Sequence, residues 1–572
     1  MRVGSPPRSP PPHTAYDRSV TQLTDTRPAI GAGPALSSPA PLRPAPDFGP
    51  TDRARGWLVT IFLTAVAAVT RFTMLNYPTD AGTPVFDEKH YAPQAWQMLT
   101  GGGVEDNPAY GLVVHPPVGK QMIALGEAIF GYTSWGWRFT AAVFGSLLVL
   151  LVIRITRRMA RSTLIGAIAG VLLIADGVTF VSSRIGMLDI FQAVFVVGAF
   201  GCLIVDRDEM RARLARADAE GRIAPAARAT GLEAAARVTT AGTGSAAIAF
   251  SAFGPRLGVR WWRFGAGLLL GLSCGTKWSG LYFILFFGLM TVCFDVAARK
   301  AYGVPRPWVG TAVRDIGPAL YALVLIPLLV YLTSYWGWFA SEDGYDRYSV
   351  GNAVGAGGTW SWVPDALRSL WHNQAESLKF HESLTNSAGN HHPWESKPWS
   401  WPMGLRPMLY YYADNGVTGC GQSVCVKAVM LIGTPAMWWL SLPMLAWALW
   451  RTATRRDWRY AAMLVGYGAG LLPWFADLDR QMYYFYAVPM APFLVMGLAL
   501  TLGDILGPAP LVRARSGRWF ALAGERRSLG LLLVCLYLGL VIANFIWLWP
   551  ILTALPITPS NWHDHLWLPS WR

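Results

Sequence analysis

Residues 56–77 read GWLVTIFLTAVAAVTRFTMLNY, and this run decides the class of fold. A helix that crosses a bilayer needs about 20 consecutive, mostly apolar residues, and the run is long enough. Residues 1–55 are rich in Pro, Ser, Ala and Arg without helical periodicity, which predicts a disordered cytoplasmic tail. The tail has no apolar region of a signal peptide, so we expect residues 56–77 to be retained as the first membrane helix.

The rest of the chain repeats this apolar pattern. Of its 572 residues, 53% are hydrophobic and 14% are charged, whereas soluble domains carry about 25% charged residues. The mean hydropathy is +0.31. Further apolar runs fall at about 134–153, 163–181, 185–205, 263–276, 278–297, 316–337, 428–450, 460–476, 482–503 and 529–549. The predicted fold is therefore an all-α polytopic membrane protein with about 11 transmembrane helices and large outer loops.

The net charge of +14 could suggest nucleic-acid binding, but its distribution argues against that class. More than half of the 48 Lys and Arg residues lie in segments between apolar runs, at 154–161, 206–263, 298–315, 451–459 and 504–528. Such clustering is typical of the cytoplasmic side of a membrane protein. It predicts a cytoplasmic N-terminus, an outer C-terminus and no nucleic-acid partner.

These assignments divide the chain into consecutive parts. They are a cytoplasmic tail at 1–55, a first membrane half at 56–205 with a catalytic outer loop at 78–133, a cytoplasmic insertion at 206–262, membrane helices at 263–337, a large outer loop at 338–427, membrane helices at 428–549 and an outer C-terminal tail at 550–572. The insertion is rich in Ala and Arg, and we expect it to be partly helical and partly loose.

The candidate active site is the sequence FDEKHY at residues 86–91, in the first outer loop. A solvated surface pair is the ordinary interpretation of an isolated Asp-Glu dipeptide. Here aromatic residues flank the pair, and Trp96 follows on a predicted interfacial amphipathic helix. A carboxylate held against an apolar surface has a raised pKa and can act as a base. We therefore predict a functional role for Asp87 and Glu88.

Residues 115–120, HPPVGK, lie in the same loop. Proline fixes φ and glycine permits a sharp bend, so we expect a stiff extended turn that presents Lys120 near the membrane surface. One interpretation is an interfacial anchor whose lysine reaches toward the headgroups. The alternative is contact with an anionic lipid phosphate.

Four more cations lie at predicted outer ends of helices, away from the cytoplasmic clusters: Arg138, Arg184, Lys277 and Arg480. Charges at membrane depth are costly and usually mark a site or an ion pair. Each of the four is a candidate for phosphate binding. Arg184 and Asp189 could pair with each other or with neighbours, and for Asp189 a structural role is favoured.

Residues 390–402, NHHPWESKPWSWP, form an outer segment that is dense in aromatic residues. Tryptophan rings stack on sugars or rest at the level of lipid headgroups. Adjacent His391 and His392 could suggest a metal site, but adjacent residues rarely both bind one ion and no third ligand is evident. We therefore expect no metal here.

Cys420 and Cys425 are the two cysteines of the chain that lie in a loop. The other four lie in apolar runs, where we expect them to act as small hydrophobic residues. The outer face permits oxidation, which favours a local disulfide between Cys420 and Cys425. Two free thiols are the alternative, because the spacing alone does not prove that the sulfur atoms can meet.

In order along the chain, these motifs resemble the bacterial branch of the protein O-mannosyltransferases, a family of polytopic glycosyltransferases. The resemblance rests on FDEKHY, HPPVGK, Trp135-x-x-Arg138, Arg184-x-x-x-Leu-Asp189, GTKW at 275–278, the 390–402 segment and DRQMY at 479–483, and covers about residues 56–505. Each motif is weak alone, but together they are specific. Eukaryotic members carry a β-trefoil-type module in the large outer loop, for which residues 338–427 leave no room.

The resemblance implies a GT-C-type architecture and transfer of mannose, with inversion, from a polyprenyl-phosphate carrier to Ser or Thr hydroxyls of proteins. The acceptors would be secreted or membrane proteins, met outside the bacterial plasma membrane during export, and no cofactor is required. Asp87 would be the base with Glu88 in support, and the donor phosphate would contact His115, Lys120, Arg138, Lys277 and Arg480. Supporting, acceptor or sugar contacts are expected from His90, Tyr91, Arg184, Asp189, His392, Trp394, Lys397 and Trp399.

Two alternatives remain at this point. One is a related membrane glycosyltransferase that moves another lipid-linked sugar to a lipid or a glycan. The other belongs to a different class, a transporter or flippase, which would show repeats, broken helices and ionisable residues near the middle of the bilayer. The polar groups of this chain gather instead at the predicted outer ends of its helices, which favours the transferase.

Overall fold

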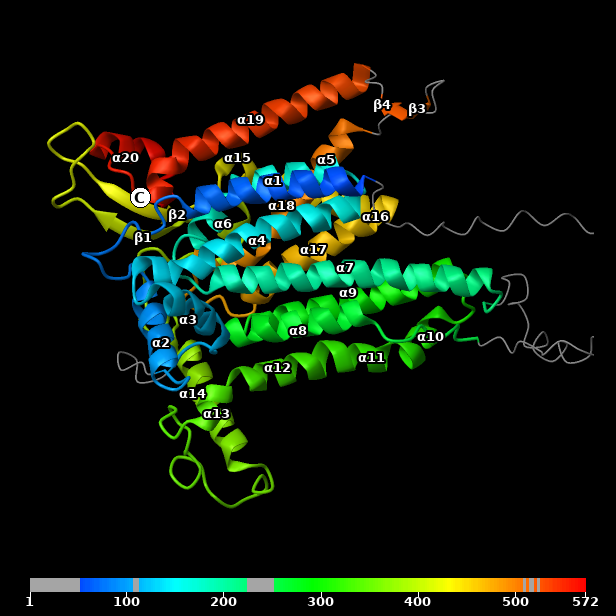
Figure 1. The fold of residues 1–572 in the computed structure, drawn as a ribbon, viewed down its shortest axis with the longest axis horizontal. Coiled ribbons are helices and arrows are strands. Elements are labelled where there is room, and N and C mark those ends of the chain that lie inside the picture. Colours follow the sequence, from blue (N-terminus) through cyan, green and yellow to red (C-terminus); the bar gives the residue numbers. More distant parts are fainter. Residues whose placement is uncertain (1–51, 106–112, 224–251, 508–510, 514–518, 522–524) are drawn as a thin grey trace, which may run out of the picture. The chain divides into compact units, whose positions relative to one another are not determined.

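The computed structural model describes residues 52–105, 113–223, 252–507, 511–513, 519–521 and 525–572 (Figure 1). The tail predicted for residues 1–55 lies almost entirely outside these residues, as does the middle of the predicted insertion at 206–262. Helix α1 begins at Arg53, close to the predicted start of the first membrane helix.

Among the described residues, seven helical stretches are long and apolar enough to cross a bilayer. They are α1 (Arg53–Phe72), α4 (Ser134–Ala160), α7 (Asp189–Ala219), α9 (Gly280–Ala301), the stretch Ile316–Ser334, the stretch Tyr484–Leu506 and the stretch Ser528–Thr553 of α19 (Glu525–Thr553). Ile316–Ser334 comprises α11 (Ile316–Leu320), a π-helical turn (Tyr321–Leu325) and α12 (Ile326–Ser334). Tyr484–Leu506 comprises a 3₁₀ segment (Tyr484–Met490) and α18 (Ala491–Leu506).

Four of the predicted membrane helices are shorter than a full span. The helices found there are α5 (Thr163–Ile174), α8 (Trp261–Thr276), α16 (Ser441–Arg455) and α17 (Trp458–Leu471). The predicted helix at 428–450 is wrong in its first part, because Lys427–Leu431 forms strand β2 and Pro435–Trp438 forms the short helix α15. Strand β2 is apolar because it is buried, and hydropathy alone does not separate a buried strand from a membrane helix.

Helix α7 is largely buried and packs against α4, α8 and α9. It continues to Ala219, well past the predicted end at residue 205. Small residues let the neighbouring helices approach closely, as is usual in membrane bundles. A Cβ atom added at Gly267 of α8 would lie 1.8 Å from the carbonyl oxygen of Ala322, so α8 could not pack against the π-helical turn with any larger residue there.

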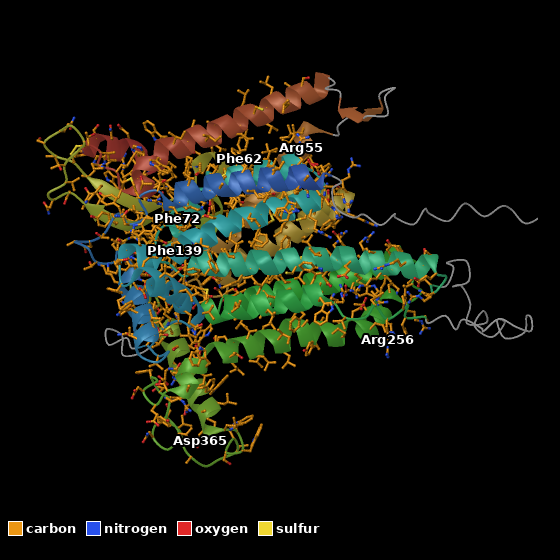
Figure 2. All side chains as sticks on the ribbon, in the orientation of Figure 1. Arg55, Phe62, Phe72, Phe139, Arg256 and Asp365 are labelled. Carbon is orange, nitrogen blue, oxygen red and sulfur yellow. A yellow bond between two sulfur atoms is a disulfide. The ribbon has the colours of Figure 1, made fainter. Side chains whose placement is uncertain are left out.

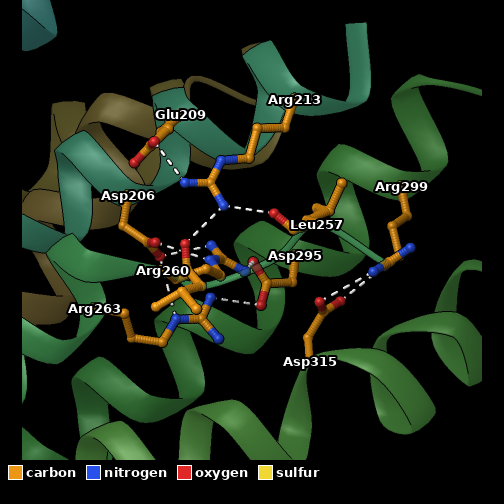
Figure 3. A network of polar contacts seen from close by, with 10 residues as sticks. Asp206, Glu209, Arg213, Leu257, Arg260, Arg263, Asp295, Arg299 and Asp315 are labelled. Carbon is orange, nitrogen blue, oxygen red and sulfur yellow. Dashed lines mark hydrogen bonds and ion pairs between the residues drawn. The ribbon is translucent and has the colours of Figure 1, made fainter. Parts of the chain in front are cut away.

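An arginine–aspartate network explains why α7 continues beyond the apolar run (Figure 3). Asp206 of α7 accepts hydrogen bonds from Arg260 at 2.6 Å and from Arg263 of α8 at 3.2 Å. Asp295 of α9 accepts from the same two arginines at 2.9 and 2.7 Å. A second pair, Arg299 of α9 and Asp315, and the contact of Arg213 with Glu209 complete the set. These charges hold α7, α8 and α9 together where the apolar packing ends.

The opposite end of the bundle, called the site end here, carries short helices and a hairpin. They are α2 (Glu88–Thr100), α3 (Val118–Phe130), α13 (Trp336–Ala340), α14 (Asp365–Ser383), β1 (Met408–Ala413), β2 and α20 (Pro559–His565) (Figure 1). The remaining α-helices and strands are α6 (Gly177–Ser182), α10 (Pro307–Arg314), β3 (Leu511–Arg513) and β4 (Trp519–Ala521), and further 3₁₀ segments lie at Pro398–Met403, Leu472–Phe475 and Pro569–Trp571. Figure 2 labels Phe72 and Asp365 toward the site end and Arg55 and Arg256 toward the other.

Strands β1 and β2 form an antiparallel hairpin in which Met408 pairs with Leu431 and Ala413 pairs with Lys427. Cys420 and Cys425, in the connection between the strands, are joined by a disulfide. Val426 and Ile557 exchange two backbone hydrogen bonds, which tie the hairpin to the segment that follows α19. The hairpin and the C-terminal segment therefore form one layer over the site end.

Candidate functional site

A cavity of about 890 Å³ opens at the site end between α7, α9, α12 and α14. Its two sides differ in chemistry. Polar and charged side chains gather on one side, among them His115, Asp189, Gln192, Lys277, His381 and Arg480. Leucine, valine and tryptophan side chains from α9, the π-helical turn, α12 and α14 line the other, among them Leu281, Val324, Leu328 and Trp371. The cavity therefore suits a ligand with an anionic head and a hydrocarbon tail.

Asp87 lies in the turn that leads into α2, next to the charged side of this cavity. It is partly exposed, and its carbonyl oxygen accepts the backbone N–H groups of His90 at 3.0 Å and Tyr91 at 3.2 Å. Burial raises the pKa of Asp87 to about 6, while nearby Lys277 lowers it and Asp189 raises it. A carboxyl group with this pKa is largely ionised at neutral pH and still basic enough to take a proton.

The backbone at Phe86 fixes the direction of Asp87. Phe86 has φ +52°, a left-handed conformation that is costly for a bulky residue. Its ring stacks on Tyr410 of β1, with 4.3 Å between ring centres, and also meets Phe485 edge-on at 6.2 Å. Strained residues of this kind cluster at active sites, where the surrounding packing holds them.

Lys277 and Asp189 form a buried ion pair beside Asp87. The Lys277 Nζ atom lies 2.8 Å from each carboxylate oxygen of Asp189. Asp189 is the first residue of α7, where the partial positive charge of the helix N-terminus favours a carboxylate. Lys277 also lies 5.1 Å from the ring centre of Phe485 and 5.8 Å from that of Tyr486. Both charged groups line the cavity.

Arg480 also lines the cavity, but its side chain differs from that of Lys277 in its partners. Within the described residues its guanidinium forms no ion pair, and its Nε–H is buried without a hydrogen-bond partner. Its Nη2 group donates to Nδ1 of His381 at 3.2 Å. An arginine with free donors at the edge of a cavity is suited to bind an oxyanion.

Glu88 and Arg138 do not line the cavity. Both side chains are fully buried, and Arg138 donates from Nε to Oε1 at 2.7 Å and from Nη2 to Oε2 at 2.8 Å. Glu88 also accepts the backbone N–H groups of Val85 at 3.1 Å and Gly186 at 2.6 Å. The expectation that Arg138 binds the donor phosphate does not fit this geometry, and Glu88 holds the turn that carries Asp87 rather than facing a substrate.

Lys120 is also placed differently from the prediction. Residues from Val118 form helix α3 rather than an extended turn, and Lys120 points inward. Its Nζ atom lies 2.5 Å from Glu105 and donates to the carbonyl oxygen of His115 at 2.8 Å. Burial lowers the pKa of Lys120 and raises that of Glu105. Lys120 therefore holds the His115 backbone in place and offers no exposed ammonium to a phosphate.

Three predicted supporting residues come from the first half of the chain. Arg184 donates to the carbonyl oxygens of Arg71, Thr73 and Met74, which closes the end of α1. Tyr91 is buried 6.0 Å from the ring of His115, and burial, with the charge of Asp87, raises its pKa well above the usual value. His90 is half-buried at the start of α2.

The aromatic segment at residues 390–402 does not line this cavity, but it anchors the loop of a residue that does. Lys397 donates to the carbonyl oxygen of Arg480 at 2.9 Å and so anchors the loop that carries this arginine. His392 packs edge-on against Tyr483, Trp394 lies under the guanidinium of Arg406, and Trp399 is exposed. In the part of the chain that the structure describes, no group of three or more His, Cys, Asp or Glu residues could hold a metal ion.

Sequence reasoning missed two residues of the site. His381 of α14 lines the cavity and contacts Arg480, but a lone histidine on an amphipathic helix carries no recognisable signal. Tyr410 of β1 has a buried hydroxyl without a hydrogen-bond partner among the described residues, and burial raises its pKa, with Asp189 and Asp87 adding to the shift. Its strand lies in a segment that was predicted as loop.

A helical membrane protein that holds a basic carboxylate beside a cavity with a cationic side and an apolar side has the layout of a membrane-embedded glycosyltransferase. Comparisons with known proteins identify the family within this class. Residues 366–571 match the C-terminal four TMM region of protein-O-mannosyltransferase, and residues 114–211 match the dolichyl-phosphate-mannose-protein mannosyltransferase family.

The curated relatives are similar over nearly the whole chain. A protein of Mycolicibacterium smegmatis named polyprenol-phosphate-mannose–protein mannosyltransferase is 58% identical over 97% of this chain and 100% of its own. The Mycobacterium tuberculosis protein of the same name is 59% identical over 96% of this chain and 98% of its own. The chain belongs to the protein O-mannosyltransferase family, which confirms the family expected from its motifs.

A solved structure shares the fold. The Saccharomyces cerevisiae protein O-mannosyltransferase Pmt1–Pmt2 complex bound to the sugar donor contains a chain that matches with a TM-score of 0.64. The match covers 92% of this chain and 95% of the yeast chain at 14% identity. The predicted class of a polytopic GT-C-type glycosyltransferase is therefore confirmed, although the predicted number of about 11 membrane helices is not.

Proposed function

We propose that this protein transfers mannose from polyprenyl-phosphate mannose to Ser or Thr hydroxyls of proteins, at the outer face of a bacterial plasma membrane. The observation that carries the proposal is the placement of Asp87 beside a cavity with a cationic side and an apolar side. The apolar side would hold the first part of the prenyl chain. Arg480 and Lys277 would face the phosphate, and the hydroxyl of the acceptor would approach from the side of Asp87.

The reaction is a single displacement in this proposal. The acceptor oxygen forms a bond to C1 of mannose while the bond from C1 to the phosphate oxygen breaks, so the configuration at C1 inverts. Asp87 takes the hydroxyl proton, and polyprenyl phosphate leaves with the bonding electrons. Arg480 and Lys277 stabilise the negative charge that grows on the phosphate, which fixed cations in a low-dielectric site do effectively. The pairing of Lys277 with Asp189 makes Arg480 the stronger contributor.

The direct test uses purified protein in liposomes with a Ser/Thr-rich peptide and labelled polyprenyl-phosphate mannose. Parallel reactions contain lipid-linked glucose or a lipid-linked pentose, and a matched peptide carries Ala at every Ser and Thr. Mannose transfer only to the hydroxyl-bearing peptide supports the proposal. Faster transfer of another sugar, or transfer to a lipid or a glycan but to neither peptide, would contradict it.

The rate of transfer should rise with pH around 6, because Asp87 must be ionised to accept the proton and its pKa is about 6. Below pH 6 the carboxyl group is protonated and the rate falls about tenfold per pH unit, whereas above pH 7 the rate should level off. Burial lowers the pKa of His381 to about 4, which places its titration below this window, and burial lowers the pKa of the neighbouring His115 as well. Initial rates between pH 5 and 8 measure this, and a flat profile would exclude Asp87 as the base.

The site end should face the outside of the cell, with the arginine-rich end in the cytoplasm. A cysteine at exposed Ala388 should react with a membrane-impermeant maleimide in intact cells, and a cysteine at exposed Arg455 should react only after permeabilisation. The parent protein is the control, because its free cysteines lie in the bundle helices α7, α8, α9 and α19. The reverse labelling pattern would overturn the orientation and the outward-facing mechanism with it.

A further inference from the structure

His381 lies near the end of α14 and is hydrogen-bonded at both ring nitrogens. Its Nε2 atom is 3.3 Å from the carbonyl oxygen of Val114, and its Nδ1 atom is 3.2 Å from Nη2 of Arg480. A carbonyl oxygen can only accept a hydrogen bond and a guanidinium can only donate one. Both contacts are therefore satisfied by one tautomer, in which Nε2 carries the proton and Nδ1 is the acceptor.

The surroundings of the ring keep it neutral. Its centre lies 5.6 Å from the ring of His115 and 5.9 Å from that of Trp278. Burial, together with the charges of Arg480 and Lys277, lowers the pKa of His381 to about 4, although the hydrogen bond to Val114 acts in the opposite direction. A second proton on the ring would place an N–H group against a guanidinium N–H group. The acceptor at Nδ1 is consequently present at every physiological pH.

Arg480 depends on this acceptor for its direction. Its backbone is fixed by two contacts, in which the N–H donates to Asp477 at 3.3 Å and the carbonyl oxygen accepts from Lys397 at 2.9 Å. Along the side chain, the described contacts are the hydrogen bond to His381 and the face of Trp474, whose ring centre is 5.7 Å from the guanidinium carbon. Nε remains buried and unpartnered at the wall of the cavity.

We propose that His381 is a positioning residue for the donor phosphate: it holds Arg480 so that the remaining N–H groups of the guanidinium face the cavity. This inference rests on the proposed function, in which Arg480 binds that phosphate. A guanidinium that is already held in its binding orientation loses less conformational freedom when it binds the phosphate, because its rotamer is fixed beforehand. His381 also joins α14, the Val114–His115 segment and the Arg480 loop, so the phosphate contact is built from three parts of the chain.

Two substitutions separate the two hydrogen bonds of the ring. The Asn amide oxygen of His381→Asn reaches the place of Nδ1 and can accept from Arg480, whereas the Gln amide nitrogen of His381→Gln reaches the place of Nε2 and can donate to Val114. His381→Gln should lower kcat/KM for polyprenyl-phosphate mannose by about tenfold, mainly through a higher donor KM, because a hydrogen bond to a charged group is lost. His381→Asn should stay near the parent KM. His372→Asn, on the same helix but outside the cavity lining, is the matched control.

A purely structural role would give a different result. Equal losses in the two variants, or a fall in kcat at unchanged donor KM, would overturn the inference. If His381→Gln does not fold, His381→Phe in its place keeps the ring and removes both hydrogen bonds, and it should raise the donor KM as well. In an Arg480→Gln background, neither His381→Gln nor His381→Phe should raise the KM further, since the group to be positioned is gone.

The same experiments distinguish the inference from the proposed function. If the parent protein does not transfer mannose from polyprenyl-phosphate mannose, the proposed function is wrong. If the parent is active, Arg480→Gln raises the donor KM, and His381→Gln and His381→Phe leave it unchanged, then the proposed function stands and the role of His381 is wrong.

Discussion

Asp87→Asn is expected to lower the turnover of mannose transfer by roughly 10²–10⁴-fold, the usual contribution of a positioned base. The amide keeps the shape of the side chain, but it cannot take the proton of the acceptor hydroxyl. The donor KM should change little, because Asp87 faces the acceptor in this arrangement while Arg480 and Lys277 line the cavity. Single-turnover rates with labelled donor, in liposomes that hold equal amounts of protein, give the comparison.

Asp80→Asn is the matched control for this experiment. Asp80 lies in the same loop, is exposed, and keeps its backbone pairing with Thr83 in the variant because only the side chain changes. Its activity should equal that of the parent. Turnover near the parent rate in Asp87→Asn would mean that another group takes the proton, and Asp87 would then lose its proposed role.

Removing one partner of the Glu88–Arg138 pair should destabilise the protein by about 3–5 kcal/mol, because a buried charge is left without its counterpart. Both side chains have an exposed fraction of 0%, and Glu88 accepts four hydrogen bonds at distances of 2.6 to 3.1 Å. Glu88→Gln and Arg138→Leu should therefore shift unfolding in detergent–SDS mixtures strongly. Loss of activity in these variants should follow the loss of folded protein.

The exposed pair Lys379–Glu376 serves as the comparison, since Glu376→Gln in that pair should leave the unfolding transition in place. Combining Glu88→Gln with Arg138→Leu in one variant should cost less than the sum of the two single changes, which is the sign of direct coupling. If Arg138→Leu instead unfolds like the parent but has lost its affinity for the donor, Arg138 belongs to the phosphate site after all.

The parts of the fold and site that could be predicted depend on local signals. The run 56–77 indicates α1, and an acidic dipeptide between aromatic residues indicates the turn that carries Asp87. Pairing partners could not be predicted, because they are distant in sequence: Glu88 and Arg138 are 50 residues apart, and Lys277 and Asp189 are 88 apart. The amino-acid sequence alone does not distinguish a cation that is buried in an ion pair from a cation that faces a ligand.

The same reasoning separates the predicted phosphate ligands. Lys120 and Arg138 are held by Glu105 and Glu88, whereas Arg480 has no acidic partner within the described residues. The site also depends on α14, which lines the cavity, and on β1, whose Tyr410 stacks on Phe86, and both elements come from the predicted outer loop at 338–427. Their side chains reach the site only because the chain crosses back over the bundle end, and periodicity does not reveal such a crossing.

The arginine–aspartate network at the far end of the bundle has a consequence for how this family can diverge. Asp206 precedes the connection between α7 and α8, whereas Arg260 and Arg263 follow it, and these side chains bind each other directly. The two helices are thus joined by buried ion pairs as well as by the chain that connects them. Loss of one of these charges would leave its partner buried and unpaired, so Asp206 and the two arginines are expected to change together or not at all.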